Sequence, residues 1–157
     1  MSNSPRQPHP LGMAQAALMA ALLAVLSQLA IPLQLVPINL GLLAVLLIGL
    51  VLPPRQAMQA VGLYLLMGAL GLPVFAGTRG GPQALFGPTG GYLLGYFLAA
   101  AAISLPGERA HGFAARLSLC ALGLLCCYIP GALYLAFLTG RAIPDVLSLA
   151  VLPFLPG

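Results

Sequence analysis

The chain has 157 residues, of which 61% are hydrophobic and only 5% are charged, and its formal net charge is +4. A soluble domain carries roughly 25% charged residues, so this composition excludes an ordinary soluble protein and indicates an integral membrane protein. The positive charge is then a topology signal and not a nucleic-acid footprint.

The apolar segments predict an all-α membrane protein, a compact bundle of transmembrane helices. A hydrocarbon core about 30 Å thick needs about 20 helical residues. The apolar segments predict helices at 12–31, 38–52, 57–72, 89–105 and 113–138, and the start of a sixth helix near Asp145.

The second predicted helix, at 38–52, ends at Pro53-Pro54, because proline lacks an amide hydrogen and disfavours helical geometry in the residue before it. At about 15 residues this helix is roughly 22 Å long, which is short for a membrane span. Short hydrophobic segments point to a cavity in transporter folds. A tilted neighbour or a locally thinned bilayer also accommodates one, so both interpretations stay open.

We expect an N-terminal cytoplasmic tail at 1–10 and a transmembrane domain at 11–157. The first apolar run is long and lacks a clear cleavage site, which predicts that it is retained and not removed as a signal peptide. Arginine placement favours a cytoplasmic N-terminus in the cell membrane. This orientation places Arg6, Arg55, Arg109 and Arg116 inside and Arg79 and Arg141 outside.

The segment Pro73–Tyr92, PVFAGTRGGPQALFGPTGGY, is rich in glycine and proline and lies between two predicted spans. Lipid offers no hydrogen bonds, so irregular backbone near membrane depth survives only where protein buries it or where it lines a wet cavity. This loop is therefore the first candidate for a ligand site, on the outer face.

Catalysis is hard to build from this inventory. The chain has two carboxylates, Glu108 and Asp145, and two imidazoles, His9 and His111, so paired acid and base groups on one membrane face are not available. We predict that the protein is not an enzyme. The phosphate-binding motif GxxxxGK[ST] is impossible without lysine, so any ATP that drives transport must be hydrolysed by another subunit.

The sequence also predicts no metal site and no cofactor. Cys120, Cys126 and Cys127 lie in one predicted helix without histidine partners, and we interpret them as small apolar fillers. Glu108 and His111 form a single E-x-x-H pair. A solvated cytoplasmic turn explains this pair better than a metal site, because di-metal bundles need several such groups on facing helices.

Two predicted helices carry small residues at four-residue spacing, a pattern that lets helix backbones approach closely in lipid. On the fourth helix we interpret them as packing within this chain. On the first helix they serve either such packing or the docking of another membrane subunit. The residues are Ala16, Ala20 and Ala24 on the first helix and Gly91, Gly95 and Ala99 on the fourth.

Several motifs together resemble the BioY family of biotin transporters. The similarity runs from about Leu11 to Gly157, and GLPVFAG and GPTGGYLLGY at their mutual spacing are its most specific parts. The motifs are VPIN at 36–39, LLAVLLIGLVLPPR, LYLLMGALGLPVFAG, GTRGG, FGPTGGYLLGY and the final VLPFLPG.

The resemblance implies a six-helix bundle, five helices complete here and a sixth begun, that captures biotin from the outer face. Such a component pairs in the bilayer with a membrane coupling (T) subunit and two ATPase subunits, whose hydrolysis drives release inward. Biotin is then the transported substrate and not a cofactor. The resemblance also favours Ala16, Ala20 and Ala24 as the surface that docks the coupling subunit.

Biotin combines an apolar thioether ring, a ureido group and a carboxylate, so its site needs an apolar wall, hydrogen-bonding groups and a cation. We assign Arg79 to the carboxylate or a nearby polar part of biotin, since guanidinium matches a carboxylate in a two-pronged geometry. The alternatives are a solvated charge for Arg79, core packing or anchoring at the membrane interface for the aromatic residues, and tight turns for the glycines. The remaining candidates are Phe75, Phe86 and Tyr92 as wall, Gly77, Gly80 and Gly81 for close backbone approach, and Asn39 and Thr89 as polar contacts, with Tyr128 a weaker one.

Two departures from the family pattern matter. Asn39-Leu40-Gly41 stands where the family has a Gln-rich sequence, and the chain stops at Gly157, before an aspartate and a lysine that the family uses on its last helix. We therefore expect this exact chain to bind biotin weakly or not at all. A fragment, a gene-model error and a degenerate copy stay open, as do binding of another vitamin and a structural role without ligand.

Overall fold

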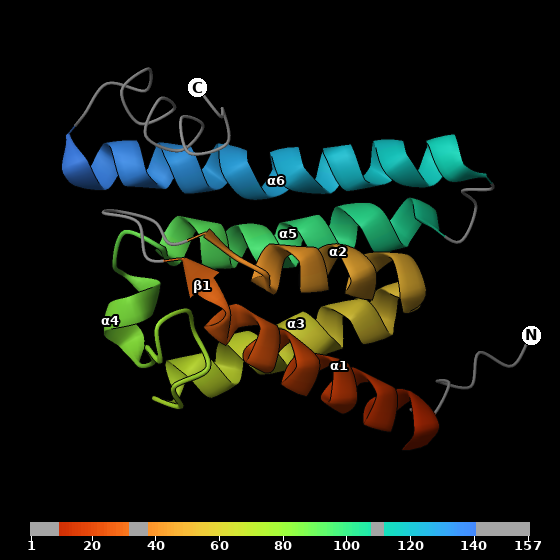
Figure 1. The fold of residues 1–157 in the computed structure, drawn as a ribbon, viewed down its shortest axis with the longest axis horizontal. Helices are drawn as coiled ribbons and strands as arrows, with labels where there is room; N and C mark the ends of the chain where they lie inside the picture. Colours follow the sequence, from red (N-terminus) through yellow and green to blue (C-terminus); the bar gives the residue numbers. More distant parts are fainter. Residues whose placement is uncertain (1–9, 32–37, 108–111, 141–157) are drawn as a thin grey trace, which may run out of the picture.

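The computed structural model describes residues 10–31, 38–107 and 112–140, which form a bundle of helices (Figure 1). Strands β1 (Ala30–Ile31) and β2 (Ile38–Asn39) form a short antiparallel pair in which Ala30 faces Asn39. The helices are α1 (Pro10–Gln28), α2 (Gly41–Val51), α3 (Pro54–Ala69), α4 (Pro82–Leu85), α5 (Gly90–Gly107) and α6 (Phe113–Thr139).

The predicted all-α fold class is confirmed, and each of the five complete predicted helices has its counterpart. Helix α2 is shorter than expected, with 11 residues, or about 16 Å at about 1.5 Å per residue. Helix α6 continues through Pro130. Sequence reasoning missed α4 and the strand pair, and the predicted tail at 1–10, apart from Pro10, and the sixth helix near Asp145 lie outside the described residues.

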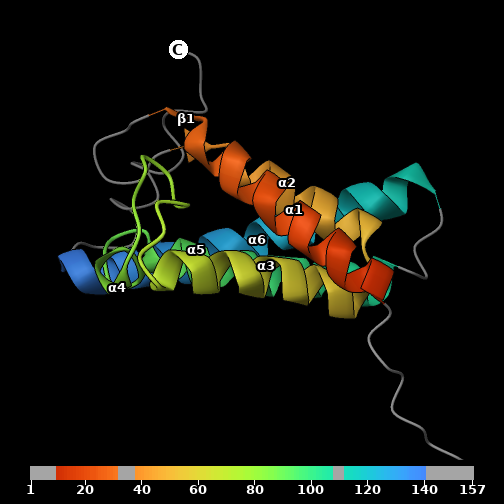
Figure 2. The same ribbon diagram turned by 90° about the horizontal axis from the view of Figure 1, so that it is seen from below.

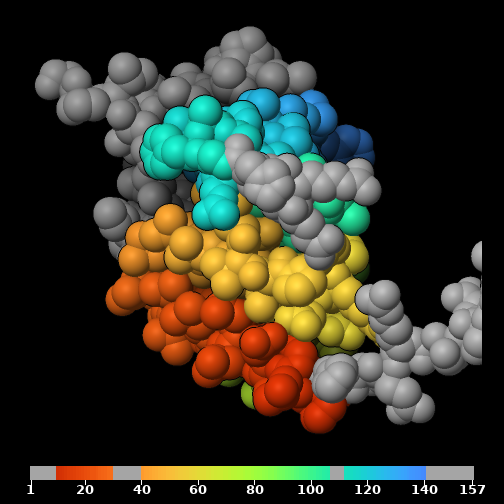
Figure 3. All heavy atoms as spheres, turned by 90° about the vertical axis from the view of Figure 1, so that its right-hand side faces the viewer, coloured from red at the N-terminus to blue at the C-terminus, as the bar shows by residue number. Residues whose placement is uncertain are grey.

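Helix α5 lies at the centre of the bundle and contacts α2, α3 and α6, while α1 packs on α3 and α2. Figures 1 and 2 show α6 running along α5, with α1 on the far side of the bundle. Figure 3 shows the close-packed atoms from the end at which α1 begins. Strand β1, helix α4 and the last turn of α6 lie at the opposite end (Figure 1), and that end carries the irregular loop.

Small residues bring α5 and α6 into backbone contact. A Cβ atom added to Gly95 would lie 2.8 Å from the Cα atom of Cys127, and one added to Gly91 would lie 2.5 Å from the Cβ atom of Tyr134. Real Cβ atoms do not come this close to backbone, so these glycines are required for the approach. Packing within the chain, the interpretation given to the small residues of this helix, is confirmed.

The alanines of α1 serve packing within the chain. Ala16 and Ala20 are only 4% and 0% exposed and Ala24 is half-buried, on a helix that packs against α3 and α2. A partner subunit cannot reach Ala16 and Ala20 in this arrangement. The docking prediction for this face is therefore corrected, because a four-residue spacing identifies a smooth face but not the side of the bundle to which that face turns.

The outside of the bundle is apolar. Helices α1 and α6 are long and apolar enough to cross a membrane, and α2 and α5 are shorter apolar helices. Large hydrophobic side chains point outward on several helices, among them Phe113 at 83% and Phe137 at 86% exposure. Such a surface is an aggregation liability in water and is suited to lipid. Inside the bundle, the Tyr64 hydroxyl donates to the Ser27 hydroxyl at 3.0 Å, so this buried pair is satisfied.

We expect Gly95→Ala to destabilise the bundle, because its Cβ atom would press on the Cys127 backbone. Overpacking of this kind costs about 1–3 kcal/mol. The matched control is Gly62→Ala, whose Cβ atom would meet only the ring of Phe97 at 3.8 Å and which gains about 0.5–1 kcal/mol of helix preference. Thermal unfolding in detergent micelles measures both. Equal melting temperatures for the two variants would contradict the packing described for α5 and α6.

Candidate functional site

The chain between α3 and α5 reverses direction in a tight loop at 75–79. The Phe75 amide donates to the Arg79 carbonyl at 2.9 Å, and the Arg79 amide donates to the Phe75 carbonyl at 3.2 Å. Gly77 and Thr78 make the reversal with φ angles of 71° and 55°. Glycine adopts such angles without strain, whereas a β-branched residue such as threonine does so only when its surroundings hold it there.

The two glycines that follow press the loop against the end of α3. The Gly81 amide donates to the Gly68 carbonyl at 2.7 Å, and Gly81 has a φ of 89°. A Cβ atom on Gly80 would collide with the Leu72 carbonyl. Both glycines are thus needed for turn geometry and for close approach of backbone to backbone. This is the turn interpretation that the sequence left open.

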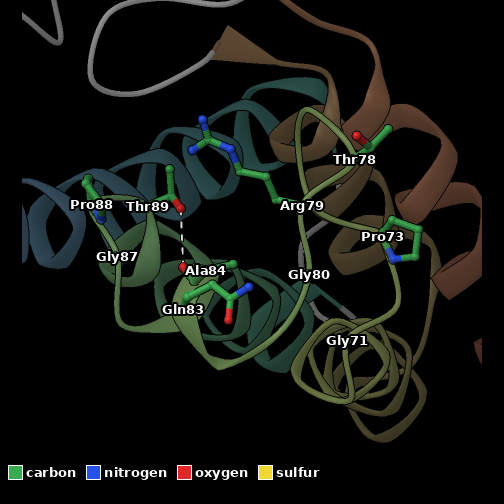
Figure 4. A pocket seen from close by; sticks show the side chains of 10 residues that line it. All are labelled: Gly71, Pro73, Thr78, Arg79, Gly80, Gln83, Ala84, Gly87, Pro88 and Thr89. Carbon is green, nitrogen blue, oxygen red and sulfur yellow. Dashed lines mark hydrogen bonds between the residues drawn. The ribbon is translucent and has the colours of Figure 1, made fainter.

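A cavity of about 510 Å³ opens beside this loop, within the range of roughly 300–1,000 Å³ that is usual for small-molecule sites. Figure 4 shows its walls, contributed by the loop, α4 and the residues just before α5. Three of the predicted site residues, Arg79, Gly80 and Thr89, line it. The full lining is Gly71, Pro73, Thr78, Arg79, Gly80, Gln83, Ala84, Gly87, Pro88 and Thr89.

The pocket combines one cation with neutral polar groups. Among the described residues that line it, Arg79 is the charged one, and its side chain extends from the loop toward Thr89 (Figure 4). The Thr89 hydroxyl donates to the Ala84 carbonyl at 3.4 Å, and the Gln83 side chain is exposed. The described residues of the lining include no carboxylate, and they suit a ligand with an anionic group and several hydrogen-bonding atoms.

Phe75 packs in the core of the bundle and does not line the pocket. It is 3% exposed, and its ring meets that of Tyr64 edge to face with centroids 5.4 Å apart. The ring occupies the space that a side chain at Gly68 would need. Phe75 thereby fastens the loop to α3. This contact agrees with core packing, the alternative interpretation that the sequence left open for this aromatic residue.

Phe86 and Tyr92 also lie away from the described pocket. Phe86 is 75% exposed, and its carbonyl accepts the Tyr134 hydroxyl at 3.0 Å. Tyr92 is 8% exposed and meets Tyr128 edge to face at 6.0 Å between ring centroids. The Tyr92 hydroxyl is buried without a hydrogen-bond partner in the described structure. Their role as an apolar wall stays a prediction.

Two further predicted contacts lie at the pocket end of the bundle. The backbone of Asn39 pairs with Ala30 in the strand pair that follows α1. Gly77 is exposed at the tip of the loop. Neither position is among those that line the described cavity, so a ligand contact for either one also stays a prediction.

Sequence reasoning missed Gln83 as a pocket residue and Gln28 as a support of the loop. Gln28 ends α1, and its side chain reaches Pro73, Phe75 and Thr78. A signal was available, since Ser27 and Gln28 are polar residues at the end of an otherwise apolar stretch. The loop partners of Gln28 were not visible, because they lie 45 to 50 residues further along the chain.

The helical bundle, its apolar exterior and a polar pocket lined by Arg79 at one end are those of an integral membrane protein with a candidate site for a small solute. Residues 3–157 match the model of the BioY family. The chain belongs to the BioY family.

Curated relatives support this assignment, two of them over 82% of their length. The chain is 40% identical over 140 residues to the biotin transporter BioY of Thermotoga maritima, covering 89% of this chain and 82% of the relative. It is 36% identical over 139 residues to a probable biotin transporter BioY of Pyrococcus horikoshii, covering 88% and 82%. It is 51% identical over 88 residues to biotin transporter BioY2 of Lactococcus lactis, covering 56% and 48%.

A solved structure has the same fold. The structure is that of the S-component for biotin from an ECF-type ABC transporter, with a TM-score of 0.83 and 25% sequence identity. The match covers 94% of this chain and 84% of that chain. The predicted family and fold class are confirmed by these findings.

The pocket geometry predicts different access to two of its walls. Thr78→Cys places a thiol at an exposed position, whereas Ala84→Cys places one at a position only 7% exposed. In a background without Cys120, Cys126 and Cys127, we expect a membrane-impermeant maleimide to label Thr78→Cys at least about tenfold faster, because reactivity follows exposure of the thiolate. Equal labelling rates in intact cells or vesicles would contradict the described pocket wall.

Proposed function

We propose that this chain takes up biotin across the cell membrane as the substrate-binding (S) component of an energy-coupling-factor transporter. The observation that carries the proposal is the structural match to a biotin S-component over 94% of this chain, supported by relatives named as biotin transporters. Relatives of this kind are transporters, which confirms the sequence prediction that the chain is not an enzyme.

The chemistry of the pocket supports biotin as the solute. The guanidinium of Arg79 offers parallel N–H donors that match a carboxylate, and biotin carries its carboxylate at the end of a flexible valerate chain. The ureido group of biotin has two N–H donors and a carbonyl acceptor. The Gln83 amide can both donate to and accept from such a group, and the Thr89 hydroxyl, whose hydrogen is donated to the Ala84 carbonyl, can accept from it.

The orientation proposed from arginine placement puts this pocket on the outer face. Arg55 then begins α3 on the cytoplasmic side, at the opposite end of the same helix from the loop that carries Arg79. Biotin would reach the pocket directly from the medium. The expectation of weak binding by this exact chain concerns the segment after Gly140, which lies outside the described residues, and it stays a prediction.

Arg79→Ala is expected to weaken biotin binding by about 10- to 100-fold, because a hydrogen bond to a charged group contributes about 1.5–3 kcal/mol. Arg79→Lys should recover part of the loss, since it keeps the charge but not the two-pronged geometry. Isothermal titration of the protein in lipid nanodiscs measures both.

Arg55→Ala is the matched control for this experiment, because Arg55 is also exposed but lies at the start of α3. We expect its biotin affinity to equal that of the unmodified chain. A Kd unchanged in Arg79→Ala, or a loss of the same size in Arg55→Ala, would contradict the assignment of Arg79. Tighter binding of another vitamin in a parallel screen would redirect the proposal to that vitamin.

The coupling subunit is proposed to dock on the outward face of α1. Ala14, Ala17 and Ala21 are exposed there, while Ala16 and Ala20 turn inward. Small exposed residues at three- and four-residue spacing let a partner helix approach closely in lipid. The partner is a membrane coupling subunit that connects the chain to two ATPase subunits.

We expect Ala21→Leu to retain biotin affinity and to lose assembly with the coupling module, because the larger side chain holds the partner helix away. The matched control is Ala121→Leu on α6, where alanine is also exposed. Co-purification with the tagged coupling subunit and uptake of labelled biotin by cells measure the two properties. Normal assembly of Ala21→Leu would rule out this docking face.

A further inference from the structure

Gln28, the last residue of α1, is bonded to a loop that is distant in sequence. Its Nε2 atom donates to the carbonyls of Pro73 and Phe75, both at 3.2 Å, and lies 3.4 Å from the carbonyl of Ala24 on its own helix. Its Oε1 atom accepts the amide hydrogen of Thr78 at 3.0 Å. One side chain thus joins the end of α1 to both arms of the loop at 73–79.

The bond to Thr78 lies where the loop is most strained. Among the described residues other than glycine, Thr78 is the one with a positive φ, at 55°. Its hydroxyl donates to the Gly77 carbonyl at 2.7 Å. A β-branched residue adopts such an angle only when its surroundings over-determine it. The acceptor on Gln28 supplies part of that restraint, one residue before Arg79.

The chemistry of the loop requires an amide at this position. The loop presents two carbonyl acceptors and one N–H donor to α1, and a neutral amide can satisfy both kinds of group at once. Lysine would lack the acceptor for Thr78. A carboxylate would lack the donors for Pro73 and Phe75.

We propose that Gln28 is a positioning residue for ligand binding. It holds the loop at 73–79 in the conformation that directs Arg79 into the pocket, and it ties this conformation to α1. The assignment rests on the proposed function, because it takes the carboxylate of biotin as the group that Arg79 meets.

The test uses Gln28→Met, which keeps the length of the side chain and removes its hydrogen bonds. Gln15→Met is the matched control, since Gln15 is an exposed glutamine on the same helix. Hydrogen exchange of the loop is measured on the ligand-free protein in nanodiscs. The Kd values for biotin and for biotin methyl ester, which lacks the anionic carboxylate, are measured on the same samples.

We expect Gln28→Met to speed amide exchange across the loop and to weaken biotin binding about tenfold, or about 1.4 kcal/mol, since the lost hydrogen bonds no longer hold the loop that carries Arg79. Binding of the methyl ester should change by less than about twofold. The double variant of Gln28→Met and Arg79→Ala should bind biotin no more weakly than Arg79→Ala alone, because the two residues act through one contact. Gln15→Met should match the unmodified chain in every measurement.

Unchanged loop exchange in Gln28→Met would overturn the proposal. So would faster exchange with unchanged biotin affinity, equal losses for biotin and its ester, or additive losses in the double variant. If Gln28→Met does not fold, Gln28→Asn keeps the amide on a shorter side chain and is expected to change the same quantities in the same direction. Equal affinity of the unmodified chain for biotin and its ester would refute the carboxylate contact of the proposed function, while loop exchange would still decide whether Gln28 holds the loop.

Discussion

Irregular backbone at the end of a membrane bundle must find its hydrogen-bond partners within the protein, and the pocket depends on how this chain meets that requirement. The loop at 73–79 pairs with itself through Phe75 and Arg79, while Gly81 donates to the end of α3. Gln28 satisfies further groups from the end of α1. These hydrogen bonds fold the loop onto two helices, which places Arg79 at the pocket.

Close backbone approach serves both the packing and the site. Gly95 lets α5 lie against α6, and Gly68 leaves room for the ring of Phe75, which fastens the loop to α3. Gly80 lets the loop turn back over Leu72. Lipid supplies little hydrophobic drive for helix association, so tight contact between small residues holds the bundle and the pocket wall together.

Much of this arrangement could be predicted from local sequence. The lengths of the apolar segments predicted the membrane-spanning helices. The glycine-rich segment with its arginine predicted Arg79, Gly80 and Thr89 as pocket residues. Four residues are too few to show a helical period, so α4 was not predictable. The inward turn of Ala16 and the contacts of Gln28 depend on partners far along the chain, which neither spacing nor residue type reveals.

The central claim is that the outer pocket holds biotin by its carboxylate. Isothermal titration of the unmodified protein in nanodiscs with biotin and with biotin methyl ester tests this claim most directly. We expect any binding of biotin by this chain to be weak but saturable, and the affinity for the ester to be lower still by about tenfold or more, because the ester lacks the charge that meets Arg79. Equal, saturable binding of the two compounds would contradict the account.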